Sequence, residues 1–330
     1  MIKPLSQTIF HLDSFAITKK EKDISTEAQD TFSRNHDPPR NLHIAMMGDS
    51  LTRYMYMSLA YYLHTGLWEL DPKVNQKDTA NSVKGFDRYI HTYYKTFDGM
   101  DKFLRKTNDF LAPFEICDCI TMLDRRKNET RYSRSFENRY YWNPETNNSL
   151  VYIQAMGNYE PSKGHYNPKE IINRKQTFPE PNIPEIWSSD WADTIQQHIA
   201  HLDPKPEFLV LNAGHWDNDF DSTPFAIEVK HAAESSGMKA IWRTTTSNRN
   251  HFFGGDREGS SKNLKNHMVD ELMCSLLDFC VDVSWTKECE SEEYFDGLHF
   301  KNESIYQRMN EQLLEAINSV HRKNDQNMKK

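Results

Sequence analysis

The chain alternates short apolar runs with stretches in which apolar residues recur every three or four positions. The first run, residues 42–47, predicts a buried strand that stops at Gly48-Asp49-Ser50. From Leu51 to Leu63 the apolar residues follow i, i+3 and i+4 spacing, which predicts an amphipathic helix that ends at Gly66. These residues therefore form a strand–turn–helix unit.

Four further strand patterns follow, and helix patterns lie between and after them. Strands are expected at residues 150–156, 208–214, 240–246 and 280–284, and helices at 187–201, 224–236, 261–278 and 302–322. This alternation is typical of an α/β fold. We expect a three-layer α/β/α architecture with a mostly parallel five-stranded sheet. Such a sheet binds ligands beyond the carboxyl ends of its strands, where the strand order reverses.

Other parts of the chain lack this rhythm. Residues 1–38 are predicted to form a polar N-terminal extension, and residues 323–330 a polar tail. Residues 67–150, rich in Tyr, Asn, Arg and Asp, are interpreted as a long insertion after the first helix that contains some strand. A Pro- and Asn-rich loop is expected at 159–184. Residues 39–322 then form a single domain.

Composition narrows the range of partners. The 330 residues contain 40 Lys and Arg against 48 Asp and Glu, a formal net charge of −8. Such a chain lacks the basic surface of a nucleic-acid binder, so no nucleic-acid partner is expected. No run of about 18 apolar residues predicts a membrane span, and no signal peptide is visible at the start.

Cysteines and glycosylation sequons bear on the compartment. Three N-x-[ST] sequons, at Asn128, Asn147 and Asn302, favour the secretory lumen or the extracellular space, with the cytoplasm as the alternative. The five cysteines are Cys117, Cys119, Cys274, Cys280 and Cys289. Because five is an odd number, at least one thiol has no partner within the chain. The pairing of the others stays open, and the alternative is that the cysteines are buried free thiols.

The candidate chemistry lies at strand ends and in the last loop. Ser50 falls at a helix N-terminus, where backbone N–H groups favour the negative charge that attack by a serine creates; its alternative role is a helix cap. In Asp296-x-x-His299 the carboxylate can orient the imidazole so that its Nε2 accepts a serine proton; the alternative is a capping Asp and a surface His. Gly157 and Gly214 are strand-end glycines that allow close approach of a ligand to backbone N–H groups.

In this order on an α/β frame, these blocks resemble the SGNH (GDSL) hydrolase superfamily. Residues 212–216, Asn-Ala-Gly-His-Trp, are similar to the N-T-G-H-W block of its PC-esterase and trichome-birefringence-like O-acetyltransferase branch. That branch also has G-D-S-L-x-R near its start and D-x-x-H near its end, which residues 48–53 and 296–299 match. The resemblance covers roughly residues 40–320 and is clearest at the motifs.

The resemblance implies a catalytic triad and an oxyanion hole. Ser50 would be the nucleophile, His299 the base and Asp296 the residue that orients the base. The N–H groups of Ser50 and Gly157 would supply oxyanion donors.

One position departs from the family pattern. Many SGNH hydrolases have Asn two residues after the glycine that corresponds to Gly214, where this chain has Trp216. Asn212 is the candidate for that missing oxyanion donor, and its alternative role is a strand-end Asn bonded to backbone.

Four residues are candidates for substrate binding: Arg53, Gly214, His215 and Trp216. Trp216 is either a sugar-stacking platform or core. Arg53, one helical turn beyond Ser50, either orients an acyl group or pairs with Asp49 or Asp296.

The resemblance thus implies serine-dependent acyl-ester chemistry on carbohydrate, either O-acetyl transfer to a glycan or removal from it. The substrate would be a glycan or another acylated small molecule, with an acetyl donor in the transfer case and with no cofactor or metal. One alternative is an inactive SGNH-like protein that only binds glycans. Another is a metal-dependent phosphodiesterase, which the lack of H-E-x-x-H or another tight ligand motif disfavours.

Overall fold

A computed structural model describes residues 38–68, 107, 111–123, 132–155, 191–215, 223–248, 261–294 and 297–328. The chain divides into two units, Met1–Asp37 and Pro38–Lys330, and every described residue belongs to the second. The predicted extension up to residue 37 and the predicted 159–184 loop therefore lie outside the described residues.

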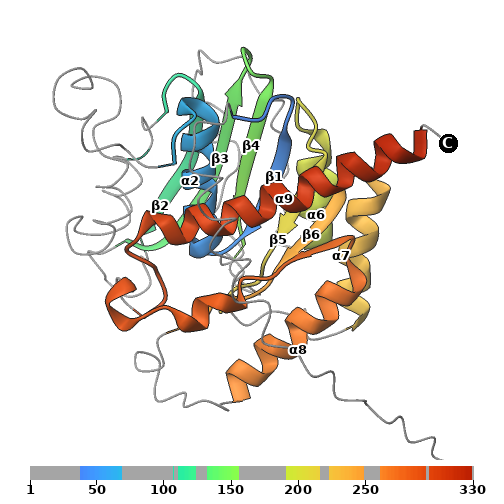
Figure 1. Ribbon diagram of the computed structural model, residues 1–330. Coiled ribbons are helices and arrows are strands. Elements are labelled where there is room, and N and C mark those ends of the chain that lie inside the picture. The colour runs from blue at the N-terminus through green and yellow to red at the C-terminus, as the bar shows by residue number, and fades with distance from the viewer. Residues whose placement is uncertain are drawn as a thin grey trace, which may run out of the picture. The chain divides into compact units, whose positions relative to one another are not determined.

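The described strands form one mixed sheet in the order β2-β3-β4-β1-β5-β6-β7 (Figure 1). Five of them, β4, β1, β5, β6 and β7, are parallel to their neighbours within this group, whereas β2 and β3 run antiparallel at one edge. Their bounds are β1 His43–Gly48, β2 Glu115–Leu123, β3 Tyr132–Asn143, β4 Asn148–Gln154, β5 Phe208–Leu211, β6 Lys239–Arg243 and β7 Phe279–Val281.

The α/β class and the mostly parallel sheet are confirmed, and each of the five expected strands is present. The expected number of five strands is wrong, because β2 and β3 bring the sheet to seven. Both belong to the 67–150 region, which we interpreted as an insertion. Their buried positions include the charged residues Glu115, Glu137 and Arg139, so no apolar alternation marked them as sheet strands.

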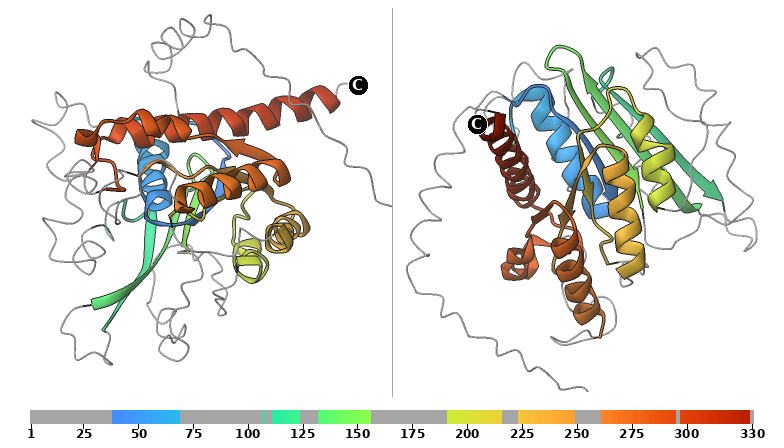
Figure 2. Two further views of the ribbon diagram at one scale, coloured as in Figure 1. Left: turned by 90° about the horizontal axis from the view of Figure 1, so that it is seen from below. Right: turned by 90° about the vertical axis from the view of Figure 1, so that its right-hand side faces the viewer.

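Helices cover both faces of the sheet (Figure 2). On β1, Ile44 and Met46 pack into the core shared with α2 and α9, whereas Ala45 and Met47 pack into the core shared with α6, α7 and α8. This alternation follows from the two-residue period of a strand. The helices are α2 Ser50–Thr65, α6 Trp191–Gln197, α7 Thr223–Ser235, α8 Ser261–Leu276 and α9 Glu303–Met328.

Helix boundaries agree with the sequence patterns at most ends. Gly66 follows α2 with a left-handed φ of 75°, and its N–H donates to the Tyr62 carbonyl, as a glycine helix stop does. Helix α9 extends to Met328, beyond the expected end at residue 322 and into the predicted polar tail. Its last turns lack apolar periodicity, which is why the pattern ended early.

Two further features concern the compartment. A disulfide joins Cys274 on α8 to Cys280 on β7, and Cys289 is a free cysteine. A structural disulfide is typical of an oxidising compartment. Across the described parts of the chain, no helix combines the length and the apolar character needed to cross a membrane.

Candidate functional site

Ser50 lies where the strand order reverses. Strand β1 ends at Gly48, α2 begins at Ser50, and β1 is flanked by β4 and β5, so the two crossovers diverge here. Asp49 is the N-cap of α2: its Oδ1 accepts the N–H groups of Leu51 and Thr52 at 3.0 and 3.3 Å. Since Asp49 fills the capping role, the Ser50 hydroxyl is available for another contact.

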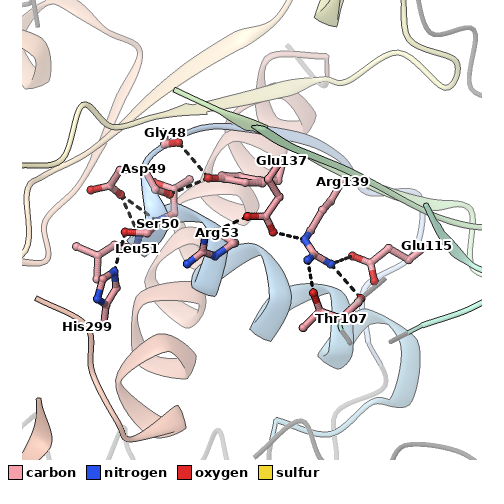
Figure 3. Close-up of polar contacts among 12 residues, drawn as sticks. Gly48, Asp49, Ser50, Leu51, Arg53, Thr107, Glu115, Glu137, Arg139 and His299 are labelled. Carbon is pink, nitrogen blue, oxygen red and sulfur yellow. Dashed lines mark hydrogen bonds and ion pairs between the residues drawn. The ribbon is translucent and has the colours of Figure 1, made fainter. Parts of the chain in front are cut away.

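That contact is with His299. Ser50 Oγ and His299 Nε2 are 2.7 Å apart, although 249 residues separate them in the chain (Figure 3). Both side chains are part-buried. A hydroxyl hydrogen-bonded to an imidazole at this distance can lose its proton to the ring as the oxygen attacks a carbonyl.

Backbone contacts between residues 293–294 and residues 300–301 hold the last loop, which carries His299. An isolated β-bridge joins Tyr294 to Phe300, and the Lys301 N–H donates to the Glu293 carbonyl at 2.7 Å. The Tyr54 ring of α2 meets the imidazole edge-on, with centroids 5.6 Å apart. The loop and α2 therefore position the imidazole together.

The turn before Ser50 is held by β4. The buried Tyr152 hydroxyl bonds to the carbonyls of Gly48 and Asp49 at 3.2 and 3.1 Å. Burial raises the pKa of Tyr152 well above its usual value, so the phenol keeps the proton that these bonds need.

Gly214 packs directly against this turn. Its φ is 64°, and a Cβ at this position would overlap the Asp49 carboxylate. Only glycine satisfies both the left-handed backbone and the close approach. The glycine of the Asn-Ala-Gly-His-Trp motif therefore meets the Gly48–Arg53 motif in space.

Asn212 has a different environment from the one expected of an oxyanion donor. Its Nδ2 donates to the Arg243 carbonyl at 2.8 Å, and its Oδ1 accepts from Arg243 Nη2. Its amide therefore faces strand β6, which matches the alternative of a backbone-bonded Asn. With its amide bonded to Arg243, Asn212 is not in position to serve as the third oxyanion donor.

Arg243 was not singled out from the sequence, yet its side chain contacts the turn that precedes α2 and the first turn of that helix. Its Nη2 donates to Thr52 Oγ1 at 3.2 Å and is 3.9 Å from Asp49 Oδ1. Burial lowers the pKa of Arg243, and Asp49 opposes that shift. This cation thus balances the carboxylate that caps α2.

Arg53 forms a buried ion pair that the sequence did not suggest. Its Nη1 is 3.0 Å from Glu137 Oε2 on β3, and both side chains are fully buried (Figure 3). Asp296, one of the two partners that the sequence suggests for Arg53, lies outside the described residues. Glu137 gave no sequence signal, because it lies 84 residues away in a strand without apolar alternation.

Several expected site residues are not described. Asp296, Gly157 and Trp216 lie outside the described residues. His215, which follows Gly214, is buried, with 8% of its surface exposed. Within the described ranges, no three His, Cys, Asp or Glu side chains form a group that could hold a metal ion.

No protein-family model matches this chain, and comparisons with curated proteins and with solved structures give no significant match.

Proposed function

We propose that the protein carries out serine-dependent acyl-ester chemistry on carbohydrate, through an acyl-enzyme on Ser50. The observation that carries this proposal is the 2.7 Å contact between Ser50 Oγ and His299 Nε2 at the start of α2. We also propose that the chain belongs to the PC-esterase and trichome-birefringence-like branch of the SGNH superfamily, on the strength of its sequence motifs.

The fold agrees with this proposal in two respects. Numbered along the chain, the five parallel strands lie in the order 2-1-3-4-5, as in doubly wound flavodoxin-like sheets, which bind ligands at the first strand. Ser50 is also the first residue of α2, where the positive end of the helix dipole lies. An oxyanion formed by attack of Ser50 Oγ would be stabilised there.

The reaction would proceed in two displacements. His299 Nε2 takes the proton from Ser50 Oγ as that oxygen bonds to the acyl carbon. Collapse of the tetrahedral intermediate breaks the ester C–O bond, and His299 returns the proton to the departing alcohol. Water or a sugar hydroxyl then attacks acyl-Ser50, with His299 again accepting and returning a proton. Water gives de-esterification and a sugar gives O-acetyl transfer.

Two further roles come from the resemblance. Asp296 would orient His299, and the N–H of Gly157 would join that of Ser50 in the oxyanion hole. The resemblance also implies a glycan as the acetyl acceptor or source. The disulfide and the sequons support a location in the secretory lumen or outside the cell.

A fluorophosphonate probe tests the nucleophile. It should label the wild type and fail to label Ser50→Ala. Ser58→Ala is the matched control, because Ser58 is a buried serine on the same helix and should leave labelling intact. Labelling that survives in Ser50→Ala would reject the assignment, and turnover lost on EDTA treatment would favour the metal-dependent alternative.

Turnover should depend on pH through the base. His299 accepts a proton only when neutral, so turnover of an acetylated sugar should fall on acidification. A flat profile would argue against a histidine base.

Asp296→Asn should retain the fold and lower turnover strongly. The corresponding change in a serine protease lowers turnover by about 10⁴-fold.

A further inference from the structure

Four buried charged side chains form a network that leads away from Ser50 (Figure 3). Arg53 on α2 contacts Glu137, Glu137 Oε1 contacts Arg139 Nε at 2.5 Å, and Arg139 Nη1 contacts Glu115 Oε1 at 3.3 Å. All four side chains are fully buried. Two cations and two carboxylates alternate, so this network of four side chains has no net charge.

Stabilisation alone explains this arrangement poorly. Taking an ion out of water is unfavourable, and buried ion pairs often stabilise a fold no better than apolar side chains of similar volume. A buried ion pair does fix the relative orientation of its two side chains, because a guanidinium binds a carboxylate in few orientations.

The geometry in this case concerns Ser50. Arg53 lies three residues after Ser50 in the first turn of α2, and its N–H bonds to the Asp49 carbonyl at 3.0 Å. Tyr152 on β4 holds the carbonyls just before Ser50. Glu137 on the neighbouring strand β3 holds Arg53 just after it. The β3–β4 pair therefore fixes the nucleophile turn on both sides.

We propose that Glu137 is a positioning residue, which sets Ser50 Oγ against His299 Nε2 through its buried ion pair with Arg53. The inference rests on the proposed function only for its effect on turnover; the effect on the Ser50–His299 contact is independent of it. Glu137 does not reach the reacting atoms itself.

The chain offers a matched control at the other end of the same charge network. Glu115 is as buried as Glu137 and also contacts Arg139, but its contact with α2 is the Tyr56 hydroxyl at 3.0 Å, one turn farther from Ser50 than Arg53 is. Burial raises the pKa of Glu115, whereas Arg139 lowers it. Glu115→Gln thus tests a comparable loss of buried charge away from the nucleophile.

The first measurement is the fluorophosphonate reaction, separated into its rate and its final extent. Glu137→Gln should slow labelling by about tenfold or more while the final labelled fraction stays complete, since small misplacements of reacting groups have effects of this size. Glu115→Gln should stay within about twofold of the wild type. A reduced final fraction with an unchanged rate would show a purely stabilising role and overturn the inference.

The second measurement does not depend on catalysis. The ¹⁵N resonance of His299 Nε2 reports its contact with Ser50, so Glu137→Gln should shift this resonance and Glu115→Gln should leave it in place. If Glu137→Gln does not fold, Glu137→Asp keeps the charge balance and should shift the resonance in the same direction. An unmoved resonance in the folded Glu137 variant would overturn the inference, whereas an unlabelled wild type would reject only the proposed function.

Discussion

Gly214 and Gly237 show at the residue scale how a close contact differs from backbone strain. Both have left-handed φ values, 64° and 69°, but a Cβ at 237 would lie 3.8 Å from its nearest neighbour, Lys205 Nζ, whereas one at 214 would overlap Asp49. The first glycine therefore has a packing requirement that the second lacks.

Alanine substitutions should separate these two effects. Gly237→Ala should lower the free energy of unfolding by about 1 kcal/mol, the strain of a left-handed residue with a side chain. Gly214→Ala should cost at least ~2 kcal/mol more, because the Asp49 cap must move. Urea unfolding measures both losses, and equal losses would contradict the close contact at Gly214.

His198 should make stability depend on pH. It is 2% exposed, its Nε2 lies 2.9 Å from the Tyr140 hydroxyl, and burial lowers its pKa to about 4. The unfolded chain then binds this proton more readily, so its contribution is complete above about pH 6.5 and is lost as the pH falls toward 4.

The expected loss through His198 between about pH 7.5 and pH 5 is about 2 kcal/mol of unfolding free energy. His198→Gln removes the titrating ring, so unfolding measured across this range should show a correspondingly smaller loss than in the wild type. Parallel curves for the two proteins would rule out a depressed pKa at this position.

Sequence reasoning found part of the site at this scale. Ser50 and His299 each lie in a short motif whose residue types suit the proposed chemistry, and the structure brings them into contact. Sequence reasoning missed Glu137, Tyr152 and Arg243, because each contacts the Gly48–Arg53 motif from a distant part of the sequence. A charged or phenolic residue in a strand carries no local sign of such a partner.

At the element scale, apolar periodicity located the five parallel strands and the helices between them. These elements bury one face or both, so their pattern follows directly from packing. Some strand was expected in residues 67–150, but β2 and β3 could not be located, because their buried positions include the charged residues Glu115, Glu137 and Arg139. The same charges now connect this edge of the sheet to α2, so the region taken as an insertion supports the site.

The disulfide between α8 and β7 allows another prediction at this scale. Cys274 and Cys280 are six residues apart, and closing so short a loop should stabilise the fold by about 2 kcal/mol. A reducing agent should therefore lower the unfolding midpoint of the wild type and of Cys289→Ser, in which the disulfide is intact. The double variant Cys274→Ser, Cys280→Ser should unfold at a lower midpoint than the wild type without reductant, and reductant should lower its midpoint by less.

At the scale of the whole molecule, topology explains why the motifs meet. Parallel strands bring their carboxyl ends to one edge, so the blocks after β1 and β5 converge although they are far apart in the chain. Gly214 against Asp49 is the contact that shows this convergence. The net charge of −8 and the polar composition played no part in locating the site.

The central claim is that Ser50 accepts an acyl group. Its most direct test is to mix the protein with an activated acetyl ester, quench in acid during turnover, and map acetylated peptides by mass spectrometry. The account predicts one acetyl group on the peptide that contains Ser50, and none on that peptide in Ser50→Ala. Turnover without any acetyl group on Ser50, or with the acetyl group on another residue, would contradict it.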